Sequence, residues 1–168
     1  MFIHVSQKYN EFMIRPTVPT DTDALVTLTE ATGLFKPLEI VALREVLDDY
    51  HAVNEADGHF AFTLVEAGAI VGFVYYAPAE MTENAWQLWW IAVRKDQQGR
   101  GAGTRLLRHA EQDIRIHHRG RVLFIETGSL PIYDRTRAFY LKNGYEQHAI
   151  LKDFYAAGDS MVVFRKEM

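Results

Sequence analysis

The part of the chain that most constrains its fold is residues 89–104, which read WWIAVRKDQQGRGAGT. The first five residues are apolar and favour a buried strand, whereas from Gly101 to about Gly120 the apolar residues recur at helical spacing. Between these two patterns lie glycines at positions 99, 101 and 103. Glycines let the backbone approach a ligand closely, and the free amides at a helix start bind anions. The segment therefore predicts a strand, an anion-binding loop and a helix, with a diphosphate as the expected ligand.

Two common phosphate-binding loops are excluded at this position. A Walker A loop requires the pattern GxxxxGK[ST], and no lysine follows any of these glycines. The dinucleotide fingerprint GxGxxG requires a third glycine where this chain has Leu106. The sequence therefore predicts neither a P-loop NTPase nor a Rossmann dinucleotide-binding domain.

Hydrophobic periodicity along the rest of the chain predicts seven strands and four helices in the order βααβββαβαββ. The length fits one domain, residues 12–168, preceded by an extension of residues 1–11. Residues Ala67 and Gly68 are expected to form a hairpin turn. Thr20 can cap the first helix, and Pro37 suits the first position of the second. The strands are expected at residues 12–15, 59–66, 70–77, 86–93, 122–126, 145–152 and 161–165.

Two segments carry a resemblance to a known family. Gln98, Gly101 and Gly103 match the pattern [QR]-x-x-G-x-[GA], and residues 139–145, FYLKNGY, match [FY]-Y-x-K-x-G-[FY]. In these elements and at this separation, the two motifs resemble the GCN5-related N-acetyltransferase (GNAT) superfamily. The resemblance covers about residues 12–166. It implies an α/β (α+β) fold in which about four helices flank a central mixed, mostly antiparallel sheet of about seven strands.

The same resemblance implies a binding site for acetyl-CoA, which would serve as the acetyl donor. The pyrophosphate is expected on the amides of the glycine loop, and the pantetheine arm is expected along the backbone of Ile91 and Val93. Tyr140 is the expected catalytic acid, because the corresponding tyrosine of the family often gives a proton to the departing thiolate. The expected cofactor contacts are Ile91, Val93, Gln98, Gly99, Arg100, Gly101, Ala102, Gly103, Thr104 and Tyr140.

Glu126 is the candidate general base. It ends the strand that follows the basic helix, close to where the two central strands of the family separate. A strand-end carboxylate that is simply solvated is an equally good interpretation. Gln87 is suited to orient a substrate but not to act as a base. Many family members carry asparagine where this chain has Tyr133, so no cofactor contact is transferred to that position. The aromatic candidates for an acceptor site are Trp89, Tyr133, Phe154 and Tyr155.

Charge is distributed unevenly along the chain. Residues 1–90 hold four basic and thirteen acidic residues, residues 94–121 hold eight basic and three acidic ones, and the net charge of the whole chain is −4. The basic segment coincides with the expected cofactor loop. The acidic half favours a cationic amine as acceptor through electrostatic steering. The distribution argues against a nucleic-acid partner, which usually requires a clearly basic face.

Composition removes several further possibilities. The chain has no cysteine, and hence no disulfide, thiolate nucleophile or Cys-based zinc site, and its histidines lack metal-ligand spacing, so no metal is predicted. No targeting signal or apolar run of about 20 residues is present, so a cytoplasmic protein without a membrane partner is expected. The resemblance also implies a homodimer as one oligomeric state, because GNAT domains often pair through their C-terminal strands.

Three functions are compatible with these features. The first is acetyl transfer from acetyl-CoA to a small-molecule or peptide amine by direct attack in a ternary complex, since no cysteine exists to form an acyl-enzyme. The second is a non-catalytic module that binds or senses acyl-CoA, which needs neither Tyr140 nor a general base. The third is an anion-binding scaffold for a partner protein, which predicts no specific affinity for CoA.

Overall fold

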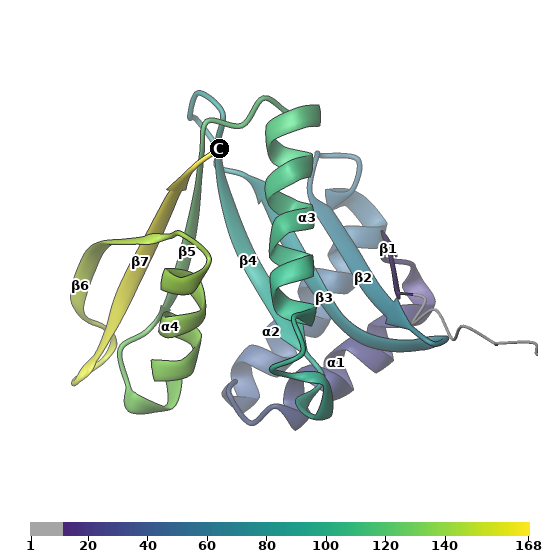
Figure 1. Ribbon diagram of the computed structural model, residues 1–168, viewed down its shortest axis with the longest axis horizontal. Coiled ribbons are helices and arrows are strands. Elements are labelled where there is room, and N and C mark those ends of the chain that lie inside the picture. The colour runs from purple at the N-terminus through teal and green to yellow at the C-terminus, as the bar shows by residue number, and fades with distance from the viewer. Residues whose placement is uncertain (1–11) are drawn as a thin grey trace, which may run out of the picture.

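The computed structural model describes residues 12–168, which form seven strands and four α-helices (Figure 1). The predicted extension, residues 1–11, lies outside the described residues. No helix within residues 12–168 is long and apolar enough to cross a membrane. The strands are β1 (Phe12–Pro16), β2 (Phe60–Glu66), β3 (Ala69–Pro78), β4 (Ala85–Val93), β5 (Val122–Gly128), β6 (Glu146–Ala156) and β7 (Asp159–Glu167). The helices are α1 (Thr22–Ala31), α2 (Pro37–Asp49), α3 (Ala102–His117) and α4 (Asp134–Lys142).

All seven strands belong to one sheet, in the order β1-β2-β3-β4-β5-β7-β6. Neighbouring strands are antiparallel except for β4 and β5, which run parallel and are connected through α3. The hairpin predicted at Ala67 and Gly68 joins β2 to β3. The predicted element order and the mixed, mostly antiparallel sheet are therefore confirmed.

Several element boundaries differ from the prediction, including that of β5, which continues to Gly128 and does not end at Glu126. Thr20 does not cap the first helix, because residues 19–21 form a 3-10 turn and α1 begins only at Thr22. The turn is held by Asp21, whose carboxylate accepts the Val18 N–H at 3.0 Å and pairs with Arg15 at 2.6 Å. At the other end of the chain, β6 and β7 are longer than predicted and are separated only by residues 157–158.

The two faces of the sheet have separate hydrophobic cores. Along β3, Val74 and Tyr76 pack in the core of α3, whereas Phe73 and Tyr75 pack in the core of α1 and α2. This division follows the two-residue period of a strand that is buried on both sides. Figure 1 shows α3 and α4 on one face of the sheet and α1 and α2 on the other. The central strands are thus covered on both faces. Polar groups of a functional site are therefore expected at the strand ends or where two strands separate.

The sheet opens between its two parallel strands. The register of β4 against β5 runs from Ala85 opposite Val122 to Leu88 opposite Ile125, and it does not continue further. Figure 1 shows the two strands diverging beyond this point. Residues 89–93 of β4 therefore have no strand partner on the β5 side, although β3 still pairs with residues 90–93 on the other.

Candidate active site

A bulge in β4 lies at the point where the strands separate. The pairing of β4 with β3 passes directly from Leu88 to Trp90, so Trp89 is the extra residue. A bulge of this kind bends the strand and redirects its side chains. Both Trp89 and Trp90 line the cavities described below. The bulge therefore contributes both to the opening of the sheet and to the walls of the site.

The first cavity is a groove of about 650 Å³ that follows the unpaired half of β4. Its walls come from β4, from the glycine loop and the first turn of α3, from the end of β5 and from α4. It contains most of the residues predicted to bind a cofactor, namely Ile91, Val93, Gln98, Gly99, Gly101, Gly103, Thr104 and Tyr140. The structure thus gathers residues from a strand, a loop and two helices into one groove.

The glycine loop is shaped by its backbone conformation. Gly101 directly precedes α3 and has a φ of 85°. This is the left-handed region of backbone conformation, which residues other than glycine rarely adopt. Gln98 donates its Nε2 hydrogen to the Val93 carbonyl at 3.1 Å, which ties the loop to the end of β4. The first amides of α3 have no helical partner, and Gly101, Gly103 and Thr104 line the groove at this point, which suits the binding of an anion at a helix start.

Gly103 has a different reason to be glycine. An added Cβ there would lie 3.3 Å from the Phe139 ring and 3.8 Å from a methyl group of Val93. Space next to this residue is therefore already occupied by α4, and a larger side chain would push the two helices apart. The third glycine of the loop serves the packing of α3 against α4, in addition to the ligand approach predicted from sequence.

The cations that line the groove come mostly from outside the basic segment. They are Lys95, Arg135 and Lys142, of which sequence reasoning named none as a ligand contact. Two predicted contacts, Arg100 and Ala102, do not line the groove; Ala102 is buried in the core beneath α3.

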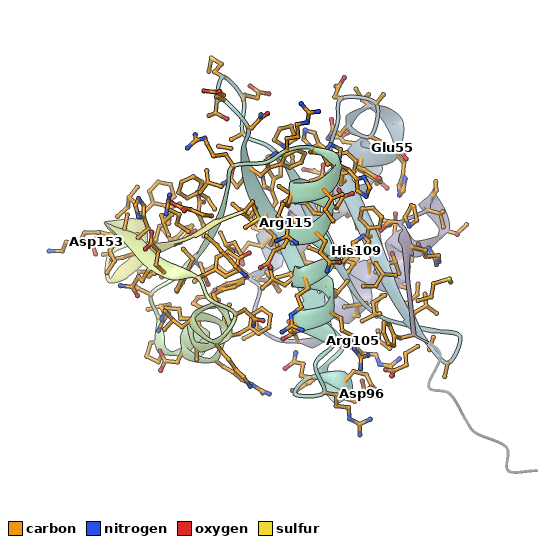
Figure 2. The ribbon with its side chains drawn as sticks, turned by 45° about the horizontal axis from the view of Figure 1, so that its top comes forward. Glu55, Asp96, Arg105, His109, Arg115 and Asp153 are labelled. Atoms are coloured by element: carbon orange, nitrogen blue, oxygen red, sulfur yellow. The ribbon has the colours of Figure 1, made fainter. Side chains whose placement is uncertain are left out.

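Other basic residues near the loop have partners of their own. Arg94 pairs with Asp96 at 2.7 Å, and Arg105 lies 4.3 Å from the centre of the Phe12 ring. Figure 2 shows Asp96 before α3 and Arg105 in its early turns. The positive charge of residues 94–121 is thus only partly directed toward the groove.

Tyr140 lies on α4 and lines the groove, with only 3% of its surface exposed. Its ring packs among those of Phe139, Tyr145 and Phe164. The hydroxyl makes no hydrogen bond to any of residues 12–168, and burial raises the pKa of Tyr140 above that of a free phenol. The hydroxyl therefore stays protonated at neutral pH and is able to donate its proton.

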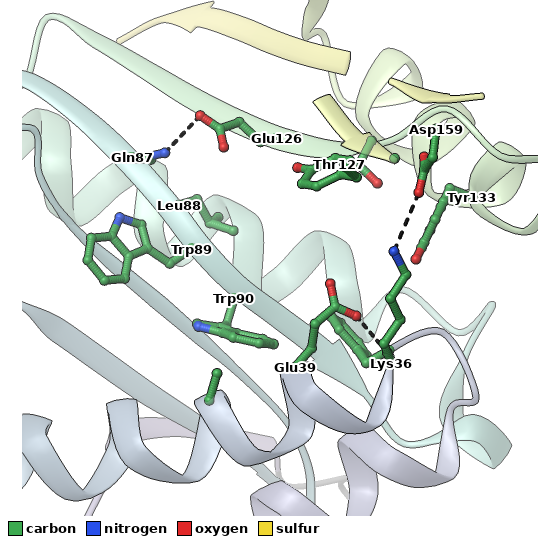
Figure 3. A pocket seen from close by; sticks show the side chains of 14 residues that line it. Lys36, Glu39, Gln87, Leu88, Trp89, Trp90, Glu126, Thr127, Tyr133 and Asp159 are labelled. Atoms are coloured by element: carbon green, nitrogen blue, oxygen red, sulfur yellow. Dashed lines mark hydrogen bonds and ion pairs between the residues drawn. The ribbon is translucent and has the colours of Figure 1, made fainter. Parts of the chain in front are cut away.

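Glu126 is the first residue of β5 beyond the last pair with β4. The Nε2 of Gln87 donates to its Oε1 at 3.0 Å across the opening of the sheet (Figure 3). Although its side chain faces a cavity, burial by its surroundings raises the pKa of Glu126. A carboxylate with a raised pKa is a stronger base than an ordinary glutamate, so the environment suits proton transfer.

A second cavity of about 410 Å³ joins the groove on the other side of Glu126. Figure 3 shows its aromatic and acidic walls. Residues common to both cavities are Phe35, Leu88, Trp89, Trp90, Glu126, Thr127 and Tyr133. Of the aromatic acceptor-site candidates from sequence, Trp89, Tyr133 and Tyr155 line this cavity, while Phe154 does not. Two ligands in the two cavities would therefore meet at Glu126.

Three residues that line the second cavity were missed in the sequence. Lys36 precedes α2, Glu39 lies in its first turn and Asp159 begins β7. The Nζ of Lys36 lies 3.6 Å from Asp159 Oδ2, and the Lys36 backbone N–H donates to Glu39 Oε2 at 2.6 Å. The only sequence signal was helix capping ahead of Pro37, because nothing local indicates that the start of α2 meets β7.

Within residues 12–168, no group of histidine, aspartate or glutamate side chains is arranged to hold a metal ion. The site is thus composed of a helix start, a protonated tyrosine, a glutamate with a raised pKa and two joined cavities. Residues 57–147, which span β2 to α4, match the model of the acetyltransferase (GNAT) domain. This part of the fold therefore defines an acetyltransferase domain.

Solved structures extend the match to nearly the whole chain. A GNAT-family protein from Desulfovibrio desulfuricans superposes with a TM-score of 0.88 and 34% identity, over 94% of this chain and 99% of that one. The protein therefore belongs to the GNAT family of acetyltransferases. The comparison with curated proteins gave no match.

More distant structures share the fold alone. An aminoglycoside 6'-N-acetyltransferase complexed with coenzyme A has 17% identity and a TM-score of 0.73, over 92% of this chain and 96% of that one. The ribosomal-protein-S18-alanine N-acetyltransferase from Escherichia coli also has 17% identity and a TM-score of 0.73, over 94% of each chain.

Proposed function

We propose that the protein is an acetyl-CoA-dependent N-acetyltransferase that acetylates a primary amine by direct attack in a ternary complex. The observation that best supports this function is that the start of α3, Tyr140 and Glu126 line a single groove. The first is suited to bind an anion, the second to donate a proton and the third to accept one. Acylation of an ammonium group by a CoA thioester would use all three.

The groove fits acetyl-CoA, which would supply the acetyl group as an activated thioester. The loop is open at Gly101, where no atom lies within 4 Å of an added Cβ, so a pyrophosphate has room beside the α3 amides. Lys95, Arg135 and Lys142 supply positive charge for the phosphates. The unpaired backbone of residues 91–93 suits the amide groups of a pantetheine chain, which would extend the sheet as an added strand.

Glu126 and Tyr140 have complementary roles in the proposed reaction. An ammonium acceptor loses two protons when it becomes an amide. One passes to the Glu126 carboxylate, which Gln87 holds at the junction of the two cavities. The departing thiolate takes the proton of Tyr140, and the second amine proton restores the hydroxyl. The C–N bond forms as the C–S bond breaks, without a covalent enzyme intermediate.

The second cavity is the proposed acceptor site. Its lining carries three carboxylates and one lysine, which favours a cationic small-molecule or peptide amine. Two structural neighbours are named for amine acceptors, an aminoglycoside and an alanine of a ribosomal protein, and these names agree with an amine substrate. No nucleic acid, membrane or metal takes part in the proposed function.

We further propose that the protein acts in the cytoplasm and as a homodimer. The lack of cysteine is compatible with a reducing compartment. At the edge of the sheet, β6 exposes the apolar side chains of Ile150, Leu151 and Phe154, which a second copy paired along this edge would help to cover. Light scattering during size-exclusion chromatography measures the oligomeric state, and a monomeric mass at assay concentration would rule out the dimer.

Two measurements test the catalytic proposal. Titration calorimetry should show binding of acetyl-CoA and desulfo-CoA but not of ATP. A thiol-release assay with a panel of amines should then show release that depends on the amine. Binding without release from any amine would instead identify an acyl-CoA-binding module. No binding of either CoA compound would contradict both functions and leave the anion-binding scaffold.

A further inference from the structure

The second cavity already contains one ammonium group, that of Lys36. Its Nζ lies 3.6 Å from Asp159 Oδ2 and 5.9 Å from the centre of the Tyr155 ring. The Lys36 side chain is 52% exposed, whereas that of Asp159 is 5% exposed. Figure 3 shows the lysine reaching from the start of α2 toward this carboxylate. The cavity wall thus provides a position for an ammonium ion, and the lysine that occupies it approaches from the solvent side.

The cavity carries more negative charge than Lys36 neutralises. Glu39, Glu126 and Asp159 line it beside this single lysine, which leaves a formal charge of −2. Burial, together with the charges of these three carboxylates, raises the pKa of Tyr155 to about 12, so their fields overlap within the cavity. The aromatic walls add ring faces that attract cations. A ligand with one positive charge would still leave the cavity negative.

The negative charge is divided between two positions. Glu126 lies at the junction with the groove, whereas Asp159 lies beside Gly128, where an added Cβ would be 3.1 Å from Asp159 Oδ1. Because Glu126 and Gly128 are two residues apart on β5, they lie on one face of the strand, with their Cα atoms about 7 Å apart. Tyr133 packs over Gly128, and burial and the charges of Glu39 and Asp159 raise its pKa. An acceptor nitrogen at Glu126 therefore leaves Asp159 as a second anionic position in the same cavity, beyond Gly128.

We propose that the acceptor is a diamine or a longer polyamine, an inference that rests on the proposed N-acetyltransferase activity. The amine at Glu126 is acetylated, with the bond changes and proton transfers given above. A second ammonium, which does not react, binds Asp159 and the face of Tyr155 in place of Lys36. The displaced Lys36 side chain turns to solvent, where half of it already lies. Diamines are thus distinguished from monoamines by a contact that only the second nitrogen makes.

The test compares three amines with the same four-carbon chain: putrescine, butylamine and γ-aminobutyrate. Thiol release is measured at saturating acetyl-CoA as a function of amine concentration. We expect kcat/KM for putrescine to exceed that for butylamine by about tenfold or more, because the second ammonium gains a charge-assisted contact. γ-Aminobutyrate should be the poorest acceptor. A preference for γ-aminobutyrate would overturn the proposal and would show that Lys36 binds a substrate carboxylate.

Two substitutions probe the second ammonium position separately. Asp159→Asn should bring the putrescine-to-butylamine ratio of kcat/KM close to unity. Lys36→Met should lower KM for putrescine several-fold, because the competing ammonium is removed; a raised KM would contradict the exchange. The matched control is Asp48→Asn, an exposed α2 residue outside both cavities, which should leave the ratio unchanged. Circular dichroism and acetyl-CoA affinity verify that each variant is folded. If Asp159→Asn does not fold, the KM of Lys36→Met for putrescine still tests the second ammonium position.

Failure of this inference is distinguishable from failure of the proposed function. Equal kcat/KM for putrescine and butylamine would refute the second ammonium position while leaving acetyl transfer intact. Absence of thiol release from every amine would refute the transferase and the diamine acceptor together.

Discussion

Replacing Tyr140 by phenylalanine separates catalysis from stability. The hydroxyl has no hydrogen-bond partner among residues 12–168, so its removal leaves no buried group unpaired. We expect the free energy of unfolding to change by less than about 1 kcal/mol, while kcat falls by about 10²-fold or more if the hydroxyl is the general acid. Affinity for acetyl-CoA should remain, because the ring and its packing against Phe164 are retained.

Tyr145 provides the matched control. Its ring lies 5.9 Å from that of Tyr140, but its hydroxyl donates to Glu111 Oε1 at 2.9 Å. Glu111 also accepts two hydrogen bonds from Lys166, and this network ties α3 to β7. Tyr145→Phe should therefore cost about 1–2 kcal/mol of stability through the lost charge-assisted bond, with kcat unchanged.

The assay combines steady-state thiol release, acetyl-CoA titration and urea unfolding for both variants. The two variants should show opposite profiles: Tyr140→Phe loses turnover and keeps stability, whereas Tyr145→Phe loses stability and keeps turnover. Full activity in Tyr140→Phe would refute the acid role. Equal loss of turnover in both variants would show that the packing around Tyr140 and Tyr145, and not the Tyr140 hydroxyl, controls activity.

Substitutions at three further positions test other parts of the structure. Glu126→Gln should abolish the rise of kcat/KM with pH. Because burial raises the pKa of Glu126, the free energy of unfolding of the wild-type protein should fall as pH rises from the ordinary glutamate pKa to the raised one. The uncharged variant should not show this fall. Gly101→Ala should cost about 1 kcal/mol and weaken acetyl-CoA binding because of its φ of 85°, whereas Gly101→Asn, which tolerates this conformation better, should cost less in urea unfolding. Asp21→Asn should destabilise the fold by about 2–3 kcal/mol, because Asp21 is buried and pairs with Arg15. Burial opposes the charged form of Asp21, but its bonds to Arg15 and to the Val18 N–H lower its pKa. The extra stability of the wild type over Asp21→Asn in thermal unfolding should therefore be complete above the ordinary aspartate pKa. It should disappear as pH falls through the lowered pKa.

Much of the fold was predictable because its signals are local. The two-residue period of the strands, the helical spacing after Gly101 and the hairpin at Gly68 each depend on a few neighbouring residues, and all three are confirmed. Thr20 shows the limit of such signals. Its residue type is right for an N-cap, but the contacts of Asp21 with Arg15, six residues away, shift the helix start to Thr22.

The site was predictable only where a motif carried it. The glycine loop was recognisable from its glycines and Tyr140 from a motif that resembles the GNAT family, and the structure places both beside one groove. The groove cations Arg135 and Lys142 were not recognisable, because they lie on α4 and reach the groove only through its packing against α3.

The sequence by itself therefore determined the element order and the position of the glycine loop before α3, and its resemblance to the GNAT family pointed to Tyr140 as the candidate acid. Only the tertiary structure decided where β4 and β5 separate, and it brought Lys36 of the α1–α2 connection within 3.6 Å of Asp159 on β7. The physical reason is the range of the interactions involved. Backbone conformation and periodicity act between neighbours in the chain, whereas the second cavity is formed by side chains more than 120 residues apart that meet only when both faces of the sheet are packed.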